Sequence, residues 1–442
     1  MKPFLALLFC SLSFAASAQI NWVKEALPII PRSAVYPNWD GVATADACAL
    51  LVNDTFKIWY SGAGWLAAGD TVVHVRIGYA WSLDGVNWTE FAGNPVLDRS
   101  SSNPNAPDFW GVETANVIYD TAAPPAERYR MWYSGKQDDT SLISGNYKVC
   151  YATSPNGINW TKYAGNPVLT AGSASDWNNL MITNVSVLRD GDTLKLWFAS
   201  PDGYPNSQPT DGKGNIGYAT STDGINWTKY ANPVLIAGIG NSPDSAAIAE
   251  PSVLKIGTTY HMWYSMINSW AIENFAVGYA TSADGINWNK HTGNPVLPLG
   301  GFGSWDRYWA AHPGVVHNPQ TGDLFMYYTG RDSTVFPSIT GYYWDLGLAR
   351  STLYTSISPQ AHTATPFTQI YPVPANDVLY IRSNETLSTI ILRDISGRVV
   401  NTEHAILSDH TELRLHTLLP GHYLVTVMYA SGLQTNHKFI VQ

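Results

Sequence analysis

A heptapeptide that recurs four times constrains the fold more than any other feature of the chain. Its form is Ser-x-Asp/Asn-Gly-x-x-Trp, and an Asn-Pro-Val-Leu run follows each copy; the copies stand at 82–88, 154–160, 221–227 and 282–288. Asp-Gly or Asn-Gly at this place suits a tight hairpin turn, in which both central residues have positive φ. The motif therefore predicts a repeated turn and packing device rather than a binding site.

Strand-like segments precede each turn. In the fourth copy they lie at 253–254, 260–264 and 277–280, before the turn that leads to Trp288. Successive motif tryptophans are separated by 72, 67 and 61 residues, which is enough for one four-stranded blade with its loops. The repeat therefore indicates a ring of blades.

A fifth copy is incomplete. Segments 325–330 and 347–351 match two strands of the first copy, but no outer strand follows them. The segment 22–30 resembles that missing strand, since it carries a tryptophan and a Pro-Ile-Ile run. We therefore predict an all-β chain with a five-bladed β-propeller over residues 19–355. The N-terminal strand closes this ring, which removes open sheet edges.

Composition agrees with this fold and limits the partners. The chain has 442 residues, more than one typical domain, and its 13% aromatic and 13% charged residues favour short aromatic-rich strands over charged helices. The formal charge of −9 is spread without a basic run, which argues against nucleic acid as a partner and favours an uncharged ligand.

The N-terminus predicts export. Residues 1–18 have a lysine, an apolar run and a final Ala-Ser-Ala, the pattern of a signal peptide. Lipid attachment at Cys10 is the alternative, which the bulky Phe9 before it disfavours. No other apolar run reaches about 20 residues, so we expect no transmembrane segment. Cys48 and Cys150 lie in strand patterns of different copies, and we expect two separate buried thiols.

The C-terminal part is a separate module. Residues 356–366 are rich in Ser, Thr, Pro and Ala, as in a linker, and the repeat does not return after them. Residues 367–442 contain alternating apolar segments separated by Ser-Gly and Pro-Gly turns. This pattern predicts a small Ig-like β-sandwich.

The innermost strands of a propeller converge on its axis, so side chains at their starts can meet there. Register among the copies locates one such position in each blade. These positions hold Asp46, Glu113, Asn184, Glu250 and His312, with Thr114 beside Glu113. Asp46, Glu113 and Glu250 are therefore the candidate catalytic acids, while Asn184 and His312 are candidate substrate ligands.

Further candidates for substrate binding lie near these strands. Trp39-Asp40 and Trp305-Asp306 recur in the loops that enter two of them, so Asp40 and Asp306 are candidates and Asp40 rivals Asp46. Indole rings can stack on sugar faces, although core packing is the alternative. The candidate rings are Trp110, Trp177, Trp305 and Trp309.

The propeller resembles the fold of arabinanases, xylosidases, levansucrases and invertases, including glycoside hydrolase families 43 and 32. The resemblance rests on the strand starts 250–253 and 312–315, the hairpin motifs and the number of blades. It implies that Asp46 is the base or nucleophile and Glu113 the supporting acid. It also implies a general-acid Glu on the third blade. Here that blade offers Asn184, and the Glu appears one blade later as Glu250.

The resemblance also bears on metal. A calcium ion near His312 fits the pattern of those families, with a hydrogen-bonded structural histidine as the alternative. We expect no other cofactor, and a carbohydrate as the ligand.

The C-terminal module resembles the type A sorting domain of the type IX secretion system of Bacteroidetes. The matching segments are 371–375, 394–398, 419–423 and 438–441. The resemblance implies that the secretion machinery is a partner and that the protein is secreted or attached to the cell surface.

Two functions follow as expectations. The first is a glycoside hydrolase that uses carboxylate acid and base chemistry on an oligo- or polysaccharide. The alternative is a non-catalytic glycan-binding propeller, because the third acid is displaced. A sialidase is a weaker reading, since its turn motif has one more residue and it needs clustered arginines.

Overall fold

The computed structural model divides into two compact units, Met1–Thr355 and Ser356–Gln442. It describes residues 21–33, 36–69, 72–138, 147–173, 176–201, 213–268, 274–331, 343–352, 368–394, 398–430 and 434–442. The predicted signal peptide and linker lie outside these ranges. Within them, no helix is both long and apolar enough to cross a bilayer.

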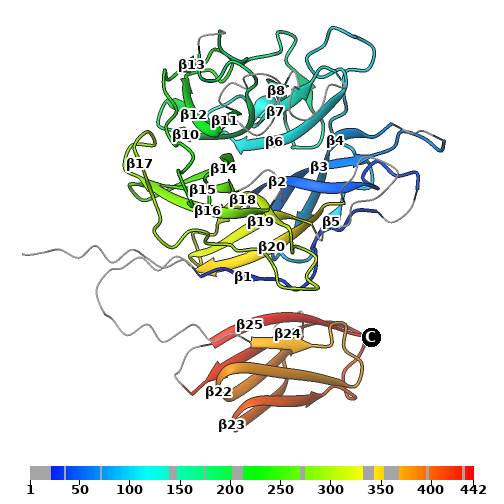
Figure 1. Cartoon of the computed structure of the whole chain (residues 1–442). Coiled ribbons are helices and arrows are strands. Elements are labelled where there is room, and N and C mark those ends of the chain that lie inside the picture. Colours follow the sequence, from blue (N-terminus) through cyan, green and yellow to red (C-terminus); the bar gives the residue numbers. More distant parts are fainter. Residues whose placement is uncertain are drawn as a thin grey trace, which may run out of the picture. The chain divides into compact units, whose positions relative to one another are not determined.

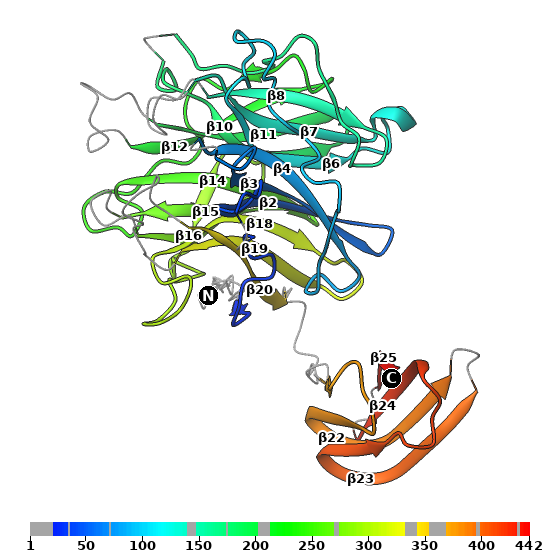
Figure 2. The ribbon, with the colours of Figure 1, turned by 90° about the vertical axis from the view of Figure 1, so that its right-hand side faces the viewer.

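The first unit is a propeller of five four-stranded antiparallel blades (Figures 1 and 2). The innermost strands are β2 (Ala43–Val52), β6 (Gly111–Tyr119), β10 (Thr183–Asp190), β14 (Ala247–Ile256) and β18 (Trp309–His317). The second strands are β3 (Thr55–Gly64), β7 (Tyr129–Lys136), β11 (Thr193–Pro201), β15 (Thr259–Ile267) and β19 (Asp323–Arg331). The third strands are β4 (His74–Ser82), β8 (Tyr147–Ser154), β12 (Gly214–Ser221), β16 (Phe275–Ser282) and β20 (Asp345–Thr352). The outer strands are β5 (Thr89–Glu90), β9 (Thr161–Lys162), β13 (Thr228–Lys229), β17 (Trp288–Lys290) and, for the fifth blade, β1 (Val23–Lys24).

The ring closes through the N-terminal strand, as predicted. Val23 and Lys24 of β1 lie opposite Arg350 and Ala349 of β20, and Ile30 forms a further bridge to Leu346. The fifth blade thus combines both ends of the propeller unit, and β18 contacts β2 to complete the ring.

The hairpin motif has a different turn geometry from the one predicted. Ser82 Oγ accepts a hydrogen bond from the Gly85 amide at 2.9 Å, and Asp84 Oδ1 accepts two from the Val86 and Asn87 amides at 2.8 Å. In the described hairpins only the glycine has positive φ, 74° at Gly85. Side-chain acceptors, rather than two left-handed residues, close the turn.

The same motif links neighbouring blades. Trp59 Nε1 donates to the Gly157 carbonyl of the next blade at 2.7 Å, and Trp132 and Trp197 repeat this contact with Gly224 and Gly285. These contacts explain the motif as a packing device, since each joins a buried indole to the next hairpin.

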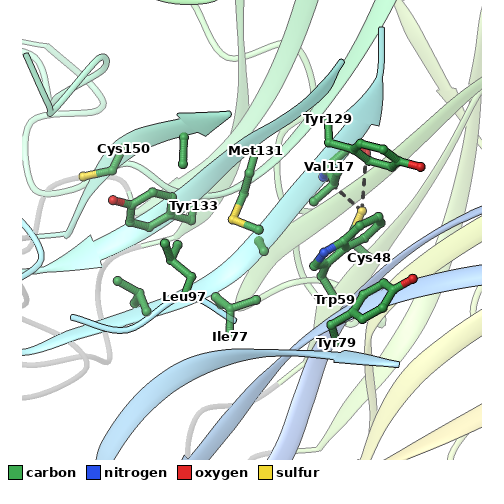
Figure 3. Packing of buried hydrophobic residues seen from close by; sticks show 13 residues of the cluster. Cys48, Trp59, Ile77, Tyr79, Leu97, Val117, Tyr129, Met131, Tyr133 and Cys150 are labelled. Atoms are coloured by element: carbon green, nitrogen blue, oxygen red, sulfur yellow. Dashed lines mark hydrogen bonds between the residues drawn. The ribbon is translucent and has the colours of Figure 1, made fainter. Parts of the chain in front are cut away.

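The two thiols are separate and buried, as predicted. Figure 3 shows Cys48 beside Val117 at one side of the cluster between the first two blades, and Cys150 beside Tyr133 at the other. The Val117 amide donates to Cys48 Sγ at 3.2 Å, and burial raises the pKa of Cys48 to about 11. Both groups are thus core components.

The second unit is an all-β module. Its strands are β21 (Thr368–Tyr371), β22 (Val378–Asp394), β23 (Val399–Arg414), β24 (Gly421–Tyr429) and β25 (Gln434–Val441). The first half of β22 pairs with β21 and the second half with β24, while β23 pairs along both halves. Side chains from both halves, such as Leu379 and Leu392, share one core. The module therefore has its own hydrophobic interior.

Candidate functional site

Five residues, one from each innermost strand, form a ring around the channel, hereafter the channel ring. They are Asp46, Thr114, Asn184, Glu250 and His312, and their φ angles are 53°, 51°, 49°, 56° and 51°. Each lies at a β-bulge in its strand, for example between Ala45 and Cys48 in β2. Left-handed backbone is uncommon outside glycine and is most costly here for the β-branched Thr114, and a repeated outlier of this kind is typical of a functional site.

Hydroxyl groups hold this bulged backbone. Four of the five ring amides donate to a Ser or Thr on the second strand of the preceding blade: Thr114 to Ser61 (2.9 Å), Asn184 to Ser134 (3.3 Å), His312 to Ser265 (3.0 Å) and Asp46 to Thr329 (3.1 Å). These four amides are thus satisfied although the bulge takes them out of the ladder. Sequence reasoning missed these hydroxyls, although a Ser or Thr two residues after the buried aromatic was a signal for them in four of the five copies.

Two cavities of about 390 and 240 Å³ meet at the channel ring, and all five ring residues line both. The larger one runs along the innermost strands. The smaller one is lined by the starts of these strands and by aromatic side chains, among them Tyr147, Trp309 and Trp344. The smaller cavity is therefore a mixed apolar and acidic pocket of the kind that binds small ligands.

His312 joins the two carboxylates of the ring. Its Nδ1 contacts Asp46 Oδ1, and its Nε2 contacts Glu250 Oε1. The other oxygen of Glu250, Oε2, accepts hydrogen bonds from the Ser265 hydroxyl and, at 3.2 Å, from the His312 amide. The three side chains therefore form one connected group.

Burial changes the pKa of both His312 and Glu250. It lowers the pKa of His312 to about 3 and raises the pKa of Glu250 to about 7, against the lowering effect of the Ser265 and His312 hydrogen bonds. A neutral imidazole that donates from Nδ1 to Asp46 can accept at Nε2 from protonated Glu250. In this arrangement the imidazole of His312 donates to Asp46 and accepts from Glu250.

The structure corrects the prediction for the second blade. Thr114, not Glu113, occupies the ring position, because the bulge turns the later residue toward the axis. Glu113 lines only the smaller cavity, beside Tyr147. Burial raises its pKa, against a hydrogen bond from Tyr147 and the charge of Lys136. Glu113 thus lies near the ring as a further, partly buried acid.

Asn184 and Trp309 also line the smaller cavity. The indole of Trp309 stacks on Trp344 with ring centroids 5.5 Å apart, and the Arg331 guanidinium lies 4.8 Å from the Trp309 ring. These two aromatic side chains form a wall of the pocket.

The other three predicted tryptophans lie in packing positions, outside the lining of either cavity in the described residues. Trp177 stacks on Phe198, and Trp305 stacks on Tyr328 at 5.5 Å. Trp110 lies against His74. Periodicity along the chain does not distinguish these rings from ligand-binding ones.

Asp40 and Asp306 are also placed away from both cavities. Asp306 Oδ2 accepts hydrogen bonds from Lys24 at 2.5 Å and from Tyr328 at 3.0 Å, which makes it a buried structural acid. Asp40 is buried at the same position of the first blade. Neither takes the place of Asp46.

The sequence predicted either a calcium ion near His312 or a hydrogen-bonded structural histidine, and the contacts of its imidazole bear on this choice. Both ring nitrogens of His312 are already in contact with carboxylates. No group of three or more His, Cys, Asp or Glu side chains in the described ranges is arranged to hold a metal ion.

Sequence comparisons find different relatives for different parts of the chain. Residues 369–442 match the family of the secretion system C-terminal sorting domain. A protein of Mycobacterium tuberculosis whose function is uncharacterised is 24% identical over 326 residues, 72% of this chain and 92% of its own. A β-1,2-mannobiose phosphorylase of Thermoanaerobacter is 27% identical over 138 residues, 30% of this chain and 45% of its own.

Solved structures share the propeller. One of them is a protein of the GH130 family of mannoside phosphorylases, which contains glycoside hydrolases that target β-1,2 mannosidic linkages in Candida mannan. It has a TM-score of 0.55 at 17% identity over 77% of this chain and 95% of its own. A glycosyl hydrolase of Bacteroides ovatus has TM-score 0.55 at 17% identity over 76% of this chain and 94% of its own. The protein thus joins a β-propeller of the fold found in glycoside hydrolases and phosphorylases to a sorting domain of the type IX secretion system.

Proposed function

We propose that the propeller cleaves glycosidic bonds at the channel ring, and that the tail exports this activity to the cell surface or beyond. The observation that carries the proposal is the contact of His312 with Asp46 on one side and Glu250 on the other. Glycosidic cleavage needs one protonated and one ionised carboxyl group, about 5 to 9.5 Å apart. One imidazole ring with a hydrogen bond at each end gives a separation of this order.

Each group has a role in the proposed reaction. Protonated Glu250 donates its proton to the leaving oxygen, for which its raised pKa suits it. Asp46 is the carboxylate that activates water or attacks the anomeric carbon. His312 touches both and acts as a positioning residue. Glu113 is the supporting acid, and Trp309 is a surface on which a sugar ring can stack.

The substrate is a neutral glycan in this proposal. The smaller cavity has apolar walls and buried acids, which suit uncharged hydroxyl-bearing rings. The similarity to a β-1,2-mannobiose phosphorylase and to the family-130 fold makes β-1,2-linked mannosides the first substrates to test.

A glycan-binding propeller without activity is the second candidate. The observation in its favour is that Thr114 and Asn184 occupy two ring positions, so the ring itself supplies only two carboxylates. In this case the protein binds the same sugars and releases nothing.

The test is product analysis on β-mannosides, arabinans, xylans and fructans, with and without inorganic phosphate. We expect reducing sugar without phosphate, and at least 100-fold less from Asp46→Asn. A sugar phosphate formed only with phosphate would identify phosphorolysis instead. Binding without any product from the wild type would favour the second candidate.

A further inference from the structure

A buried polar position repeats six residues before each residue of the channel ring. It holds Asp40, Asp108, Asn178, Asp244 and Asp306 in blade order. All five side chains are at most 3% exposed. A buried carboxylate needs a compensating charge or a proton, and the blades differ in what they provide.

In three blades a lysine of the outer strand compensates the carboxylate. Lys162 Nζ lies 2.6 Å from Asp108 Oδ2, Lys24 Nζ lies 2.5 Å from Asp306 Oδ2, and Lys290 forms the same ion pair with Asp244. Each ammonium also donates to a backbone carbonyl of the loop that enters its blade: Asp98, Pro298 and Ile236. The repeated device is a cation enclosed by oxygen atoms.

The third blade shows that, in the described part of the chain, the ion pair is absent where the buried residue carries no charge. Here Asn178 replaces the aspartate, and Phe198 replaces the tyrosine that binds it elsewhere, as Tyr133 binds Asp108. Among the described residues, Lys229 then donates to the Thr170 carbonyl alone, at 3.2 Å. Where an uncharged asparagine replaces the aspartate, the contacts made by the tyrosine and lysine of the other blades are not formed with it in the described ranges.

The first blade keeps the acid but has no lysine at the matching position of its outer strand. In this blade Glu90 occupies the position that a lysine holds in the other blades. The strand register shows the equivalence, since each of these outer-strand residues lies opposite an alanine of the third strand: Ala80, Ala152, Ala219, Ala280 and Ala349. Two carboxylates, Asp40 and Glu90, thus stand where other blades have a carboxylate and an ammonium.

The geometry leaves one oxygen without a partner. Asp40 Oδ1 is buried and accepts no hydrogen bond in the described residues, while Tyr60 donates to Glu90 Oε2 at 3.0 Å. Burial, with the charge of Glu90, raises the pKa of Asp40 to about 6. The guanidinium of the buried Arg76 lowers the pKa of Asp40 by its charge and donates to the Trp65 carbonyl at 3.1 Å. The acid pair therefore has the charge of Arg76 nearby but, among the described residues, no outer-strand ammonium like that of its counterparts.

We propose that Asp40 and Glu90 bind a calcium ion that replaces the missing ammonium of the first blade. Two carboxylates balance one divalent cation, as one carboxylate balances one lysine in the other blades. Calcium accepts six to eight oxygen ligands with flexible geometry, so carbonyl, hydroxyl and water oxygens complete the site. Pro31 is equivalent by strand register to Asp98, Ile236 and Pro298, whose backbone carbonyls accept hydrogen bonds from the lysines of the other blades. The Pro31 carbonyl is therefore the corresponding oxygen in the first blade. This site is separate from the channel ring.

Equilibrium dialysis of the full chain with calcium tests the proposal, after treatment with a chelator. We expect one ion per chain, and a rise in Tm of about 4 °C at a calcium concentration about 100-fold above Kd. Glu90→Lys, which restores the residue of the other blades, should abolish binding and make Tm independent of calcium. Glu90→Gln supplies the same test of binding should the lysine variant fold poorly.

Two controls assign the site. Glu127→Lys makes the same charge change at an exposed position and should keep one bound ion. Glu250→Gln should also keep it, whereas loss there would move the ion to the channel ring and overturn the proposal. No binding by the wild type, or undiminished binding by both Glu90 variants, would likewise overturn it. A Tm that rises on acidification but ignores calcium would assign a proton, not a metal, to the pair.

Discussion

At the residue scale, surroundings rather than residue type separate the two carboxyl groups of the channel ring. Glu250 is largely buried and faces the hydroxyl of Ser265 as well as His312, while Asp46 faces the other side of the His312 imidazole. The same imidazole contacts both carboxyl groups, so protonation of one carboxyl group affects the pKa of the other. This coupling leads to two predictions.

The rate should depend on the protonation of Glu250. Because its pKa is raised to about 7, the acid form dominates below that pH and disappears above it. We expect kcat/KM to fall about tenfold per pH unit on the alkaline side of about pH 7. A pH–rate profile measures this fall. Activity that keeps rising to pH 9 would exclude Glu250 as the acid.

The unfolding free energy should also depend on the protonation of Glu250, and it should fall as the pH rises. The folded pKa lies above the ordinary value of 4.5, so below pH 4.5 both states are protonated, and between pH 4.5 and 7 the unfolded chain ionises first. The wild type should therefore lose up to about 3 kcal/mol relative to Glu250→Gln across this interval. Urea unfolding of both proteins at pH 4.5 and 7.5 gives the difference. A constant difference would contradict the buried acid.

At the scale of the strand and its hairpin, indole contacts tie each blade to the next. Trp132→Phe removes one of the two indole hydrogen bonds to the Gly224 carbonyl, which keeps the bond from Trp227, so we expect the lost hydrogen bond to cost about 0.5 to 1.5 kcal/mol of unfolding free energy. Trp263→Phe is the matched control, because its Nε1 has no partner in the described residues. Chemical denaturation compares them. Equal losses would mean that packing alone, not the contact, accounts for the cost.

The sequence predicted these elements well because repetition and turn chemistry are local properties. The blade count, the closing strand 22–30 and the role of the hairpins follow from them. The ring was harder, since one residue of bulge decides between Glu113 and Thr114. The roles of Trp305 and Asp40 depend on partners distant in the chain, which a one-dimensional pattern does not reveal.

At the scale of the whole molecule, the two units have separate cores. We therefore expect a chain that ends at Thr355 to keep the Tm and the glycan specificity of the propeller. The same chain should fail to reach the cell surface, since the sorting domain is lost. Calorimetry and fractionation of producing cells measure the two effects. A fall in Tm of more than a few degrees would show that the propeller depends on its tail.

The central claim is that the channel ring performs chemistry, and the kcat of Glu250→Gln on the best glycan found tests it most directly. The substitution keeps the shape of the side chain and removes the proton. We predict a kcat at least 100-fold below that of the wild type with Kd for the same glycan within about threefold, while Glu127→Gln matches the wild type. An unchanged kcat in Glu250→Gln would contradict the account.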